Sequence, residues 1–243
     1  MTLQTVARPK PARLASRDKK ADRTLSLTEQ VYARLRGEIL SCQLAPGQEI
    51  SESELAERFQ VSKTPVREAL ATLRQEGLVK TFPRRGYQVT PITFGDMNEL
   101  FDLRTILEAG AAELACEQIT DEEIAHLRSL GEIVYDKSSN DMITAFITAN
   151  REFHLAIAAA SRNARLYALL ERQLYELDRF FYLGAQLRDV NGETNIEHGE
   201  IIGALEKRDR MRARELMIRH NDVTRQGLFQ ALAMSRKFGS IGL

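Results

Sequence analysis

The segment QVSKTPVREALATLRQEGLV, residues 60–79, constrains the fold most, because it combines a helical pattern with a proline near its start. Pro65 has no backbone N–H, so it is best tolerated in the first turn of a helix. Ser62 precedes it and is a suitable N-cap, whose hydroxyl can accept from a free backbone N–H. The helical spacing of apolar residues predicts one packed face formed by Val66, Leu70 and Leu73. We therefore expect a helix that begins at Ser62 and ends at Gly77.

The opposite face of this helix is basic near its start, where Lys63, Thr64 and Arg67 project away from the apolar stripe. The sequence LVKTFPRRGYQVT follows, with β-favouring residues on both sides of a tight basic turn. We expect this part to form two strands joined by the turn that contains Arg84, Arg85 and Gly86.

Two further helices are predicted upstream. The sequence SESELAERF begins with Ser51 followed by Glu54, the spacing of a capping box, and only QVS separates this helix from the basic one. Ser26 and Glu29 show the same spacing at the start of a helix that runs to Leu40. Three helices and a two-stranded wing predict a winged helix-turn-helix domain over residues 26–92.

A helix-turn-helix places the first residues of its second helix in the major groove of DNA. Arg67 is the best candidate for a bidentate contact to guanine, Lys63 could contact a base or a phosphate, and the wing arginines could reach an adjacent groove. The alternative is a solvated basic face that contacts another protein. The candidate DNA-binding residues are Ser53, Ser62, Lys63, Thr64, Arg67, Arg84, Arg85 and Gly86.

The charge is unevenly distributed between two parts of the chain. Residues 1–93 contain 16 Lys and Arg against 10 Asp and Glu, and the remaining residues contain 18 against 24, because the whole chain has 34 of each. This asymmetry is expected if the first part alone binds a polyanion. Residues 1–25 are basic and lack an apolar stripe, so we expect a disordered arm; a transit peptide is the alternative.

Neither a membrane span nor a secretory signal segment is evident in the 243 residues. Cys42 and Cys116 are isolated and have no partner spacing, which is typical of a reducing compartment. We therefore expect a cytoplasmic protein that contacts no membrane.

Residues 98–230 show helical periodicity almost throughout and predict an antiparallel all-α bundle of about six helices. The chain is thus expected to be mostly α, with the winged domain first and the bundle second. The first helix of the bundle is predicted to bury a stripe of Leu100, Leu103, Leu107, Ala111 and Leu114.

Three of the four histidines lie on apolar stripes of separate helices in this bundle. They are His154, His198 and His220, and Asn150 lies one turn before His154 on the same side. A lone inward histidine is usually a hydrogen-bonded core residue, whereas three that converge indicate a metal site; the spacing alone leaves both interpretations open. His126 is interpreted as a surface or structural residue.

The sequence LAERFQVSKTPVREALATLRQEGLV resembles the signature of the GntR family of bacterial transcription regulators. This resemblance implies that Lys63 and Arg67 occupy DNA-reading positions. Lys63 stands where arginine is frequent, so a bidentate base contact is less expected there than at Arg67. The resemblance covers about residues 26–92.

Residues 98–223 are similar to the FCD domain, the all-helical effector domain of the FadR-like branch of that family. The sequence NREFH and the two later histidines match the FCD ligand pattern, which implies a divalent metal, zinc or nickel, at Asn150, His154, His198 and His220. The resemblance also implies a neighbouring cavity for a small carboxylate metabolite. Arg104 is expected to face inward, where it pairs either with the effector carboxylate or with Glu108.

These features predict a ligand-responsive transcription regulator, a repressor that binds a short palindromic operator in double-stranded DNA as a homodimer. One alternative is a metal sensor or architectural DNA-binding protein without a metabolite. Another is a three-histidine metalloenzyme, but the sequence contains no HExxH motif and no evident general base.

Overall fold

The computed structural model describes residues 25–82 and 86–234. The predicted arm therefore lies outside the described residues, apart from its last residue, and so do Arg84 and Arg85. The elements are α1 (Leu27–Leu40), β1 (Glu49–Ile50), α2 (Glu52–Phe59), α3 (Lys63–Gln75), β2 (Val79–Phe82), β3 (Gly86–Val89), α4 (Phe94–Gln118), α5 (Asp121–Gly131), α6 (Asn140–Ala160), α7 (Ala164–Leu187), α8 (Asn191–Glu206) and α9 (Arg210–Ala233).

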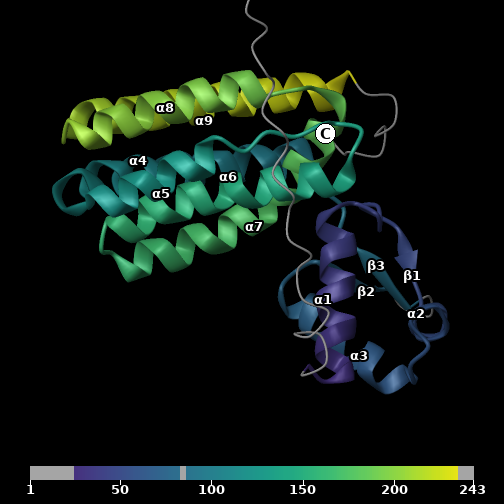
Figure 1. Ribbon diagram of the computed structural model, residues 1–243. Coiled ribbons are helices and arrows are strands. Elements are labelled where there is room, and N and C mark those ends of the chain that lie inside the picture. The colour runs from purple at the N-terminus through teal and green to yellow at the C-terminus, as the bar shows by residue number, and fades with distance from the viewer. Residues whose placement is uncertain (1–24, 83–85, 235–243) are drawn as a thin grey trace, which may run out of the picture.

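The first part of the chain folds as a winged helix-turn-helix, the class predicted from the sequence (Figure 1). Ser26 and Glu29 form a reciprocal capping box at the start of α1, and the Ser51 hydroxyl accepts from the backbone N–H of Glu54 in α2. The three helices and the sheet enclose a core of their own, which includes Leu35, Val66, Leu70 and Val89.

The sheet contains three strands rather than the two predicted, in the order β1-β3-β2. β1 is antiparallel to β3, with Ile50 opposite Tyr87. A strand of two residues is too short to show an alternating pattern, so its pairing partner had to be seen in the fold. Gly86 has a φ of +95° and a Cβ there would lie 2.8 Å from the Ile50 carbonyl oxygen, so this close approach requires glycine.

The start of α3 differs in one detail from the prediction. Ser62 occupies the N-cap position, but its side chain makes no capping hydrogen bond. Pro65 lies in the first turn and is buried, and Gly77 follows the helix with a φ of +76°. The hydroxyl of Ser62 is therefore not engaged in capping, although the helix begins and ends where the sequence indicates.

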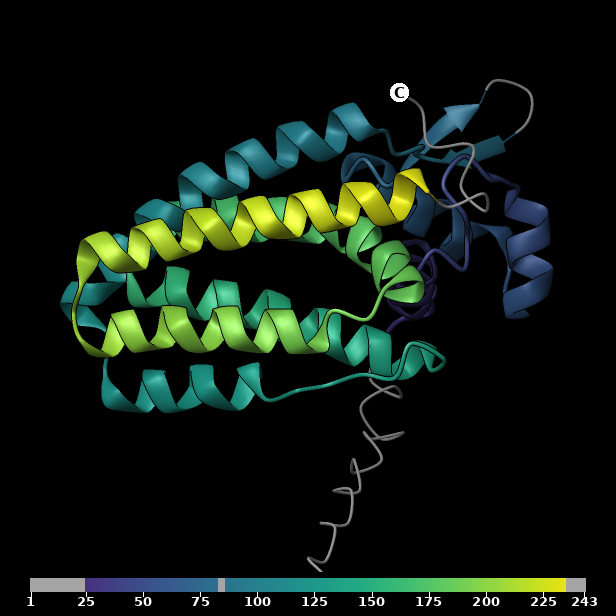
Figure 2. The same ribbon diagram turned by 90° about the horizontal axis from the view of Figure 1, so that it is seen from above.

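The helices α4–α9 form the predicted bundle, with α9 alongside α4 and between it and α8 (Figure 2). Thr93 and Asp96 form a capping box, so α4 begins at Phe94, upstream of the domain start predicted at residue 98. None of the helices within the described residues is long and apolar enough to span a membrane.

The predicted buried stripe of α4 was partly wrong. Leu103 and Leu114 are 40% and 36% exposed, whereas Phe101, Arg104 and Glu108 are buried. The face turned to the bundle continues through the small residues Ala111, Ala112 and Ala115. Small side chains allow a close helix approach, and α9 packs along this face, which explains why apolar size alone misplaced the stripe.

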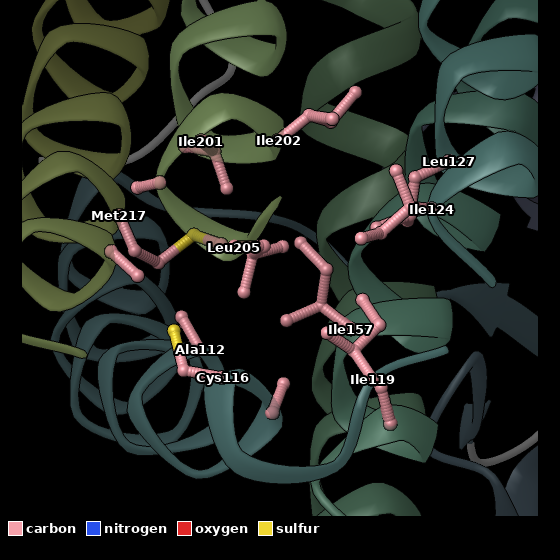
Figure 3. Close-up of a cluster of buried hydrophobic side chains, with 14 of the residues drawn as sticks. Ala112, Cys116, Ile119, Ile124, Leu127, Ile157, Ile201, Ile202, Leu205 and Met217 are labelled. Atoms are coloured by element: carbon pink, nitrogen blue, oxygen red, sulfur yellow. The ribbon is translucent and has the colours of Figure 1, made fainter. Parts of the chain in front are cut away.

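A hydrophobic cluster, drawn in Figure 3, includes the C-terminal parts of α4 and α6 and the N-terminal part of α9. These parts lie at the end of the bundle that is farther from the winged domain (Figure 1). Ile157 of α6, Ile201 and Leu205 of α8 and Met217 of α9 meet there, at most 1% exposed. This packing fixes α6, α8 and α9 relative to one another, and these are the helices that carry the three inward histidines.

The two domains meet where α1 lies against α7. Arg36 of α1 and Arg151 of α6 each lie over the Tyr175 ring at 4.4 Å from its centroid. Arg151 also forms a partly buried ion pair with Asp178. Burial raises the pKa of Asp178 to about 7, even though Arg151 opposes the shift. Residues of α1, α6 and α7 therefore share one polar cluster at the domain junction.

Candidate metal centre and DNA-reading surface

The structure brings His154, His198 and His220 together from α6, α8 and α9. One ring nitrogen of each lies within 4.8 Å of the others, and all three side chains are buried. The convergence predicted from three apolar stripes is therefore present. His126 is exposed on α5, as predicted.

Two of these imidazoles have a neighbour that orients them. His220 donates from Nδ1 to Glu197 Oε2 at 2.8 Å, which leaves its Nε2 lone pair free. The ring of His198 stacks on Phe153 with centroids 3.8 Å apart, and its Nε2 has no hydrogen-bond partner among residues 25–82 and 86–234. A buried ring nitrogen without a partner is uncommon in proteins and is consistent with a ligand that binds there.

His154 belongs to a buried polar network that begins on α4. Arg104 Nη2 donates to His154 Nε2 at 2.8 Å, and Arg104 Nε donates to Glu108 Oε1 at 3.0 Å. Glu108 Oε2 lies 3.1 Å from His154 Nδ1, which is within ion-pair distance, but the two atoms are not aligned as a hydrogen bond. The same oxygen accepts a hydrogen bond from Asn221 Nδ2 at 3.0 Å. Arg104 thus occupies the lone pair of His154, and its own Nη1 lacks a partner.

Burial and charge set the protonation of this network. Burial is the largest influence on both histidines, and it lowers the pKa of His154 to about 4 and that of His198 well below its usual range. Burial opposes ionisation of Glu108, but Arg104 and His154 together outweigh it and hold the pKa of that carboxyl below its usual range. The two imidazoles are therefore neutral and the carboxyl is ionised at pH 7.

Neutral, buried imidazoles are the donors that zinc and nickel prefer. Nitrogens bound to one zinc ion at about 2.0–2.1 Å lie roughly 3.4 Å apart in a tetrahedral site. The three rings would have to close slightly from their present separation, and Arg104 would have to leave His154 Nε2. The donor set fits a divalent metal on these two conditions.

A cavity of about 70 Å³ adjoins His220, between α6, α7, α8 and α9. Its walls include His220, Glu197 and the half-buried Asn150, together with the apolar side chains of Phe146 and Leu228. Arg104 is fully buried and is not part of these walls. Asn150 thus lines the same cavity as His220, and Arg104 forms the pair with Glu108 that was one of the two sequence alternatives.

Three residues in or near this site were not predicted from the sequence: Glu197, Arg188 and Glu193. Glu197 directly precedes His198 but orients His220, a contact between helices that no local pattern reveals. Arg188 lies at the end of α7 and lines the cavity, where it pairs with Glu193. Each of these contacts depends on how the helices pack rather than on spacing along one helix.

The candidate DNA-binding residues in the described part of the first domain are exposed on α2 and α3, with Gly86 at the start of β3. Lys63 and Thr64 lie in the first turn of α3, Arg67 lies one turn later, and Ser53 lies in α2. Ser62 is also exposed, and its hydroxyl makes no capping hydrogen bond. Arg67 pairs with Glu52 of α2 at 2.8 Å.

A winged helix-turn-helix joined to an all-helical bundle with a buried polar centre is the architecture of a DNA-binding regulator with a sensory domain. Residues 27–89 match the family described as bacterial regulatory proteins, gntR family, and residues 99–223 match the FCD domain. The chain belongs to the GntR family and carries an FCD domain.

Proteins that are similar over most of the length of this chain support the assignment to this family. The HTH-type transcriptional regulator YdhC of Bacillus subtilis is 31% identical over 205 residues, which cover 84% of this chain and 91% of that protein. The HTH-type transcriptional repressor RspR of Escherichia coli is 27% identical over 197 residues, covering 81% and 86%. Among solved structures, E. coli McbR/YncC has a TM-score of 0.70 at 26% identity and covers 85% of this chain and 98% of that one. The protein is accordingly a transcription regulator and not an enzyme.

Proposed function

We propose that this protein is a metal-containing repressor that releases its operator when a small carboxylate metabolite binds to the bundle. The observation that carries the proposal is the convergence of His154, His198 and His220 beside a cavity, in a bundle attached to a DNA-binding domain. Asn150, which lies in the cavity wall, is the fourth proposed ligand.

The proposed metal, rather than the cavity walls, which carry Glu193 and Glu197 beside Arg188, favours an anionic effector. When bound, the metal supplies a positive centre with open positions for an anionic oxygen. Asn150 is neutral, so it leaves that charge uncompensated. Arg104 Nη1 has no partner, and release of Nη2 from His154 would leave further donors for a carboxylate. Arg104 is therefore proposed as an effector contact on the condition that it leaves His154 and reaches the cavity, whose walls do not include it.

Helix α6 connects the proposed effector site to the DNA-binding domain. Asn150 lines the cavity, and the next residue, Arg151, contacts Asp178 and Tyr175 at the domain junction. A small shift of α6 would therefore alter contacts with Arg36 in α1. We propose that two chains form a homodimer on a short palindrome and that this shift changes the separation of their DNA-binding domains.

A titration of operator DNA with a carboxylate panel at constant zinc tests this proposal. We expect one mono- or dicarboxylate to weaken operator binding by about 5- to 150-fold, the usual range of coupling between sites, and its amide analogue to have no effect. Asn150→Asp should retain the metal but weaken the response, because the added charge repels the anion.

The same titration distinguishes a regulator that responds to a carboxylate metabolite from a metal sensor. His126→Ala should respond as the parent protein does, because His126 is exposed on α5. An uncharged effector would refute the account of the cavity. If zinc alone changed operator affinity and no metabolite did, the protein would be a metal sensor.

The proposed DNA-reading role of Arg67 gives a second prediction. Arg67→Ala should lose on the order of ten- to one-hundred-fold discrimination at one base pair, because a bidentate contact to guanine distinguishes it from other bases. Binding of matched and singly substituted operators measures this loss. Arg74→Ala is the control, because Arg74 is exposed in the last turn of α3, away from the end that enters the groove. Unchanged discrimination in Arg67→Ala would show that the recognition helix is misassigned.

A further inference from the structure

The guanidinium of Arg67 is held by a carboxylate from the neighbouring helix. Arg67 Nε lies 3.1 and 3.2 Å from the two carboxylate oxygens of Glu52, and Nη2 lies 2.8 Å from Oε2. Glu52 is the first residue of α2, and Arg67 lies in the second turn of α3. The ion pair therefore links the two helices of the helix-turn-helix on the surface that carries the candidate DNA contacts.

This geometry leaves one edge of the guanidinium available. A guanidinium presents five N–H donors in a rigid planar fork, and Glu52 contacts the side formed by Nε and Nη2. The edge formed by Nη1 and Nη2 points away from that carboxylate. It is the edge that can donate two parallel hydrogen bonds to O6 and N7 of guanine.

The ion pair with Arg67 contributes little to stability, although Glu52 also lies in the first turn of α2, where a carboxylate interacts favourably with the helix dipole. The Arg67 side chain is 63% exposed, and exposed ion pairs contribute little to folding. A carboxylate on this surface also repels the phosphates that Lys63 and Arg67 would approach. Arg67 in turn lowers the pKa of Glu52, so the carboxylate is ionised at neutral pH. The repulsion between Glu52 and the phosphates lowers DNA affinity, and this loss has an explanation if the carboxylate improves the selection of bases.

We propose that Glu52 is a positioning residue for base recognition, which holds Arg67 so that its free edge is presented to guanine. Without Glu52, the long exposed arginine samples many rotamers and can pair with a phosphate as readily as with a base. The proposal rests on the DNA-reading role proposed above for Arg67.

The test compares Glu52→Gln with Glu54→Gln in the full-length protein. Glu54 lies in the same first turn of α2 and is exposed, and its backbone N–H donates to the Ser51 hydroxyl. Each substitution removes one negative charge from the same helix terminus. Binding is measured at fixed salt to an operator selected from random duplexes, to single-base variants of it, and to an unrelated duplex.

We expect both variants to bind the unrelated duplex slightly more tightly, because a charge that repels phosphate is gone. Only Glu52→Gln should lose discrimination, by about 3- to 10-fold, at the base pair that Arg67→Ala identifies. Glu52→Asp should lose less, because it keeps the charge but shortens the reach. In an Arg67→Ala background, Glu52→Gln should have no further effect on discrimination.

Two outcomes would overturn the inference in distinguishable ways. If Glu52→Gln and Glu54→Gln behave alike while Arg67→Ala loses discrimination, Arg67 reads DNA without help from Glu52. If Arg67→Ala keeps full discrimination, the proposed role of Arg67 fails, and the positioning role fails with it. Thermal unfolding of each variant by circular dichroism shows that the differences do not arise from loss of fold.

Discussion

Replacing His198 with alanine is expected to lower the affinity for zinc by about 100-fold or more, and His154→Ala and His220→Ala should have the same effect. Each of the three buried imidazoles contributes one nitrogen to a group within 4.8 Å, so loss of any one leaves a pair with far weaker affinity. Competition with a chromogenic chelator measures the affinity, and elemental analysis of the dialysed protein measures the metal content, about one ion per chain in the parent.

His126→Ala is the matched control, because it removes an exposed imidazole of the same bundle. His198→Gln provides a second variant that fills more of the space beside Phe153 but is a poor ligand, so it separates metal loss from a packing defect. Full metal occupancy in all three alanine variants would mean that the histidines serve core packing and hydrogen bonding only.

Glu108→Ala is expected to destabilise the bundle by about 3–5 kcal/mol, because it leaves the fully buried guanidinium of Arg104 without its ion-pair partner. Asn221 Nδ2 would also lose its acceptor. Urea unfolding followed by circular dichroism in the presence of a chelator measures this loss without a contribution from metal. The buried network should thus be among the most sensitive positions in the protein.

An exposed ion pair serves as the comparison that tests whether burial is the cause of the large loss in Glu108→Ala. Glu206 pairs with Arg128, and their side chains are 39% and 53% exposed, so Glu206→Ala should cost about 1 kcal/mol or less. The double substitution Arg104→Leu with Glu108→Leu should recover much of the stability lost in Glu108→Ala, because neither charge is then buried. A loss in Glu108→Ala no larger than in Glu206→Ala would contradict the strength assigned to the buried pair.

Local signals made the winged domain predictable. Ser26 and Glu29 act within the first turn of α1, and Pro65 and Gly77 each mark one end of α3, so their meaning is independent of the rest of the fold. β1 was missed, because two residues carry no periodicity and its pairing depends on β3, far along the chain. The face of α4 was partly misjudged for a similar reason: the helix buries Phe101, small residues and an ion pair, whereas Leu103 and Leu114 are exposed.

The sequence by itself determined the order of the two domains, the helices that bear the inward histidines, and the basic start of the recognition helix. These follow from periodicity, caps and charge, which are properties of short segments. Only the tertiary structure decided which partners those side chains have: Arg104 with Glu108 and His154, His220 with Glu197, and Arg67 with Glu52. The last two contacts join different helices, and so does that of Arg104 with His154. Their distances are set by how the helices pack against each other, which spacing along the chain does not encode.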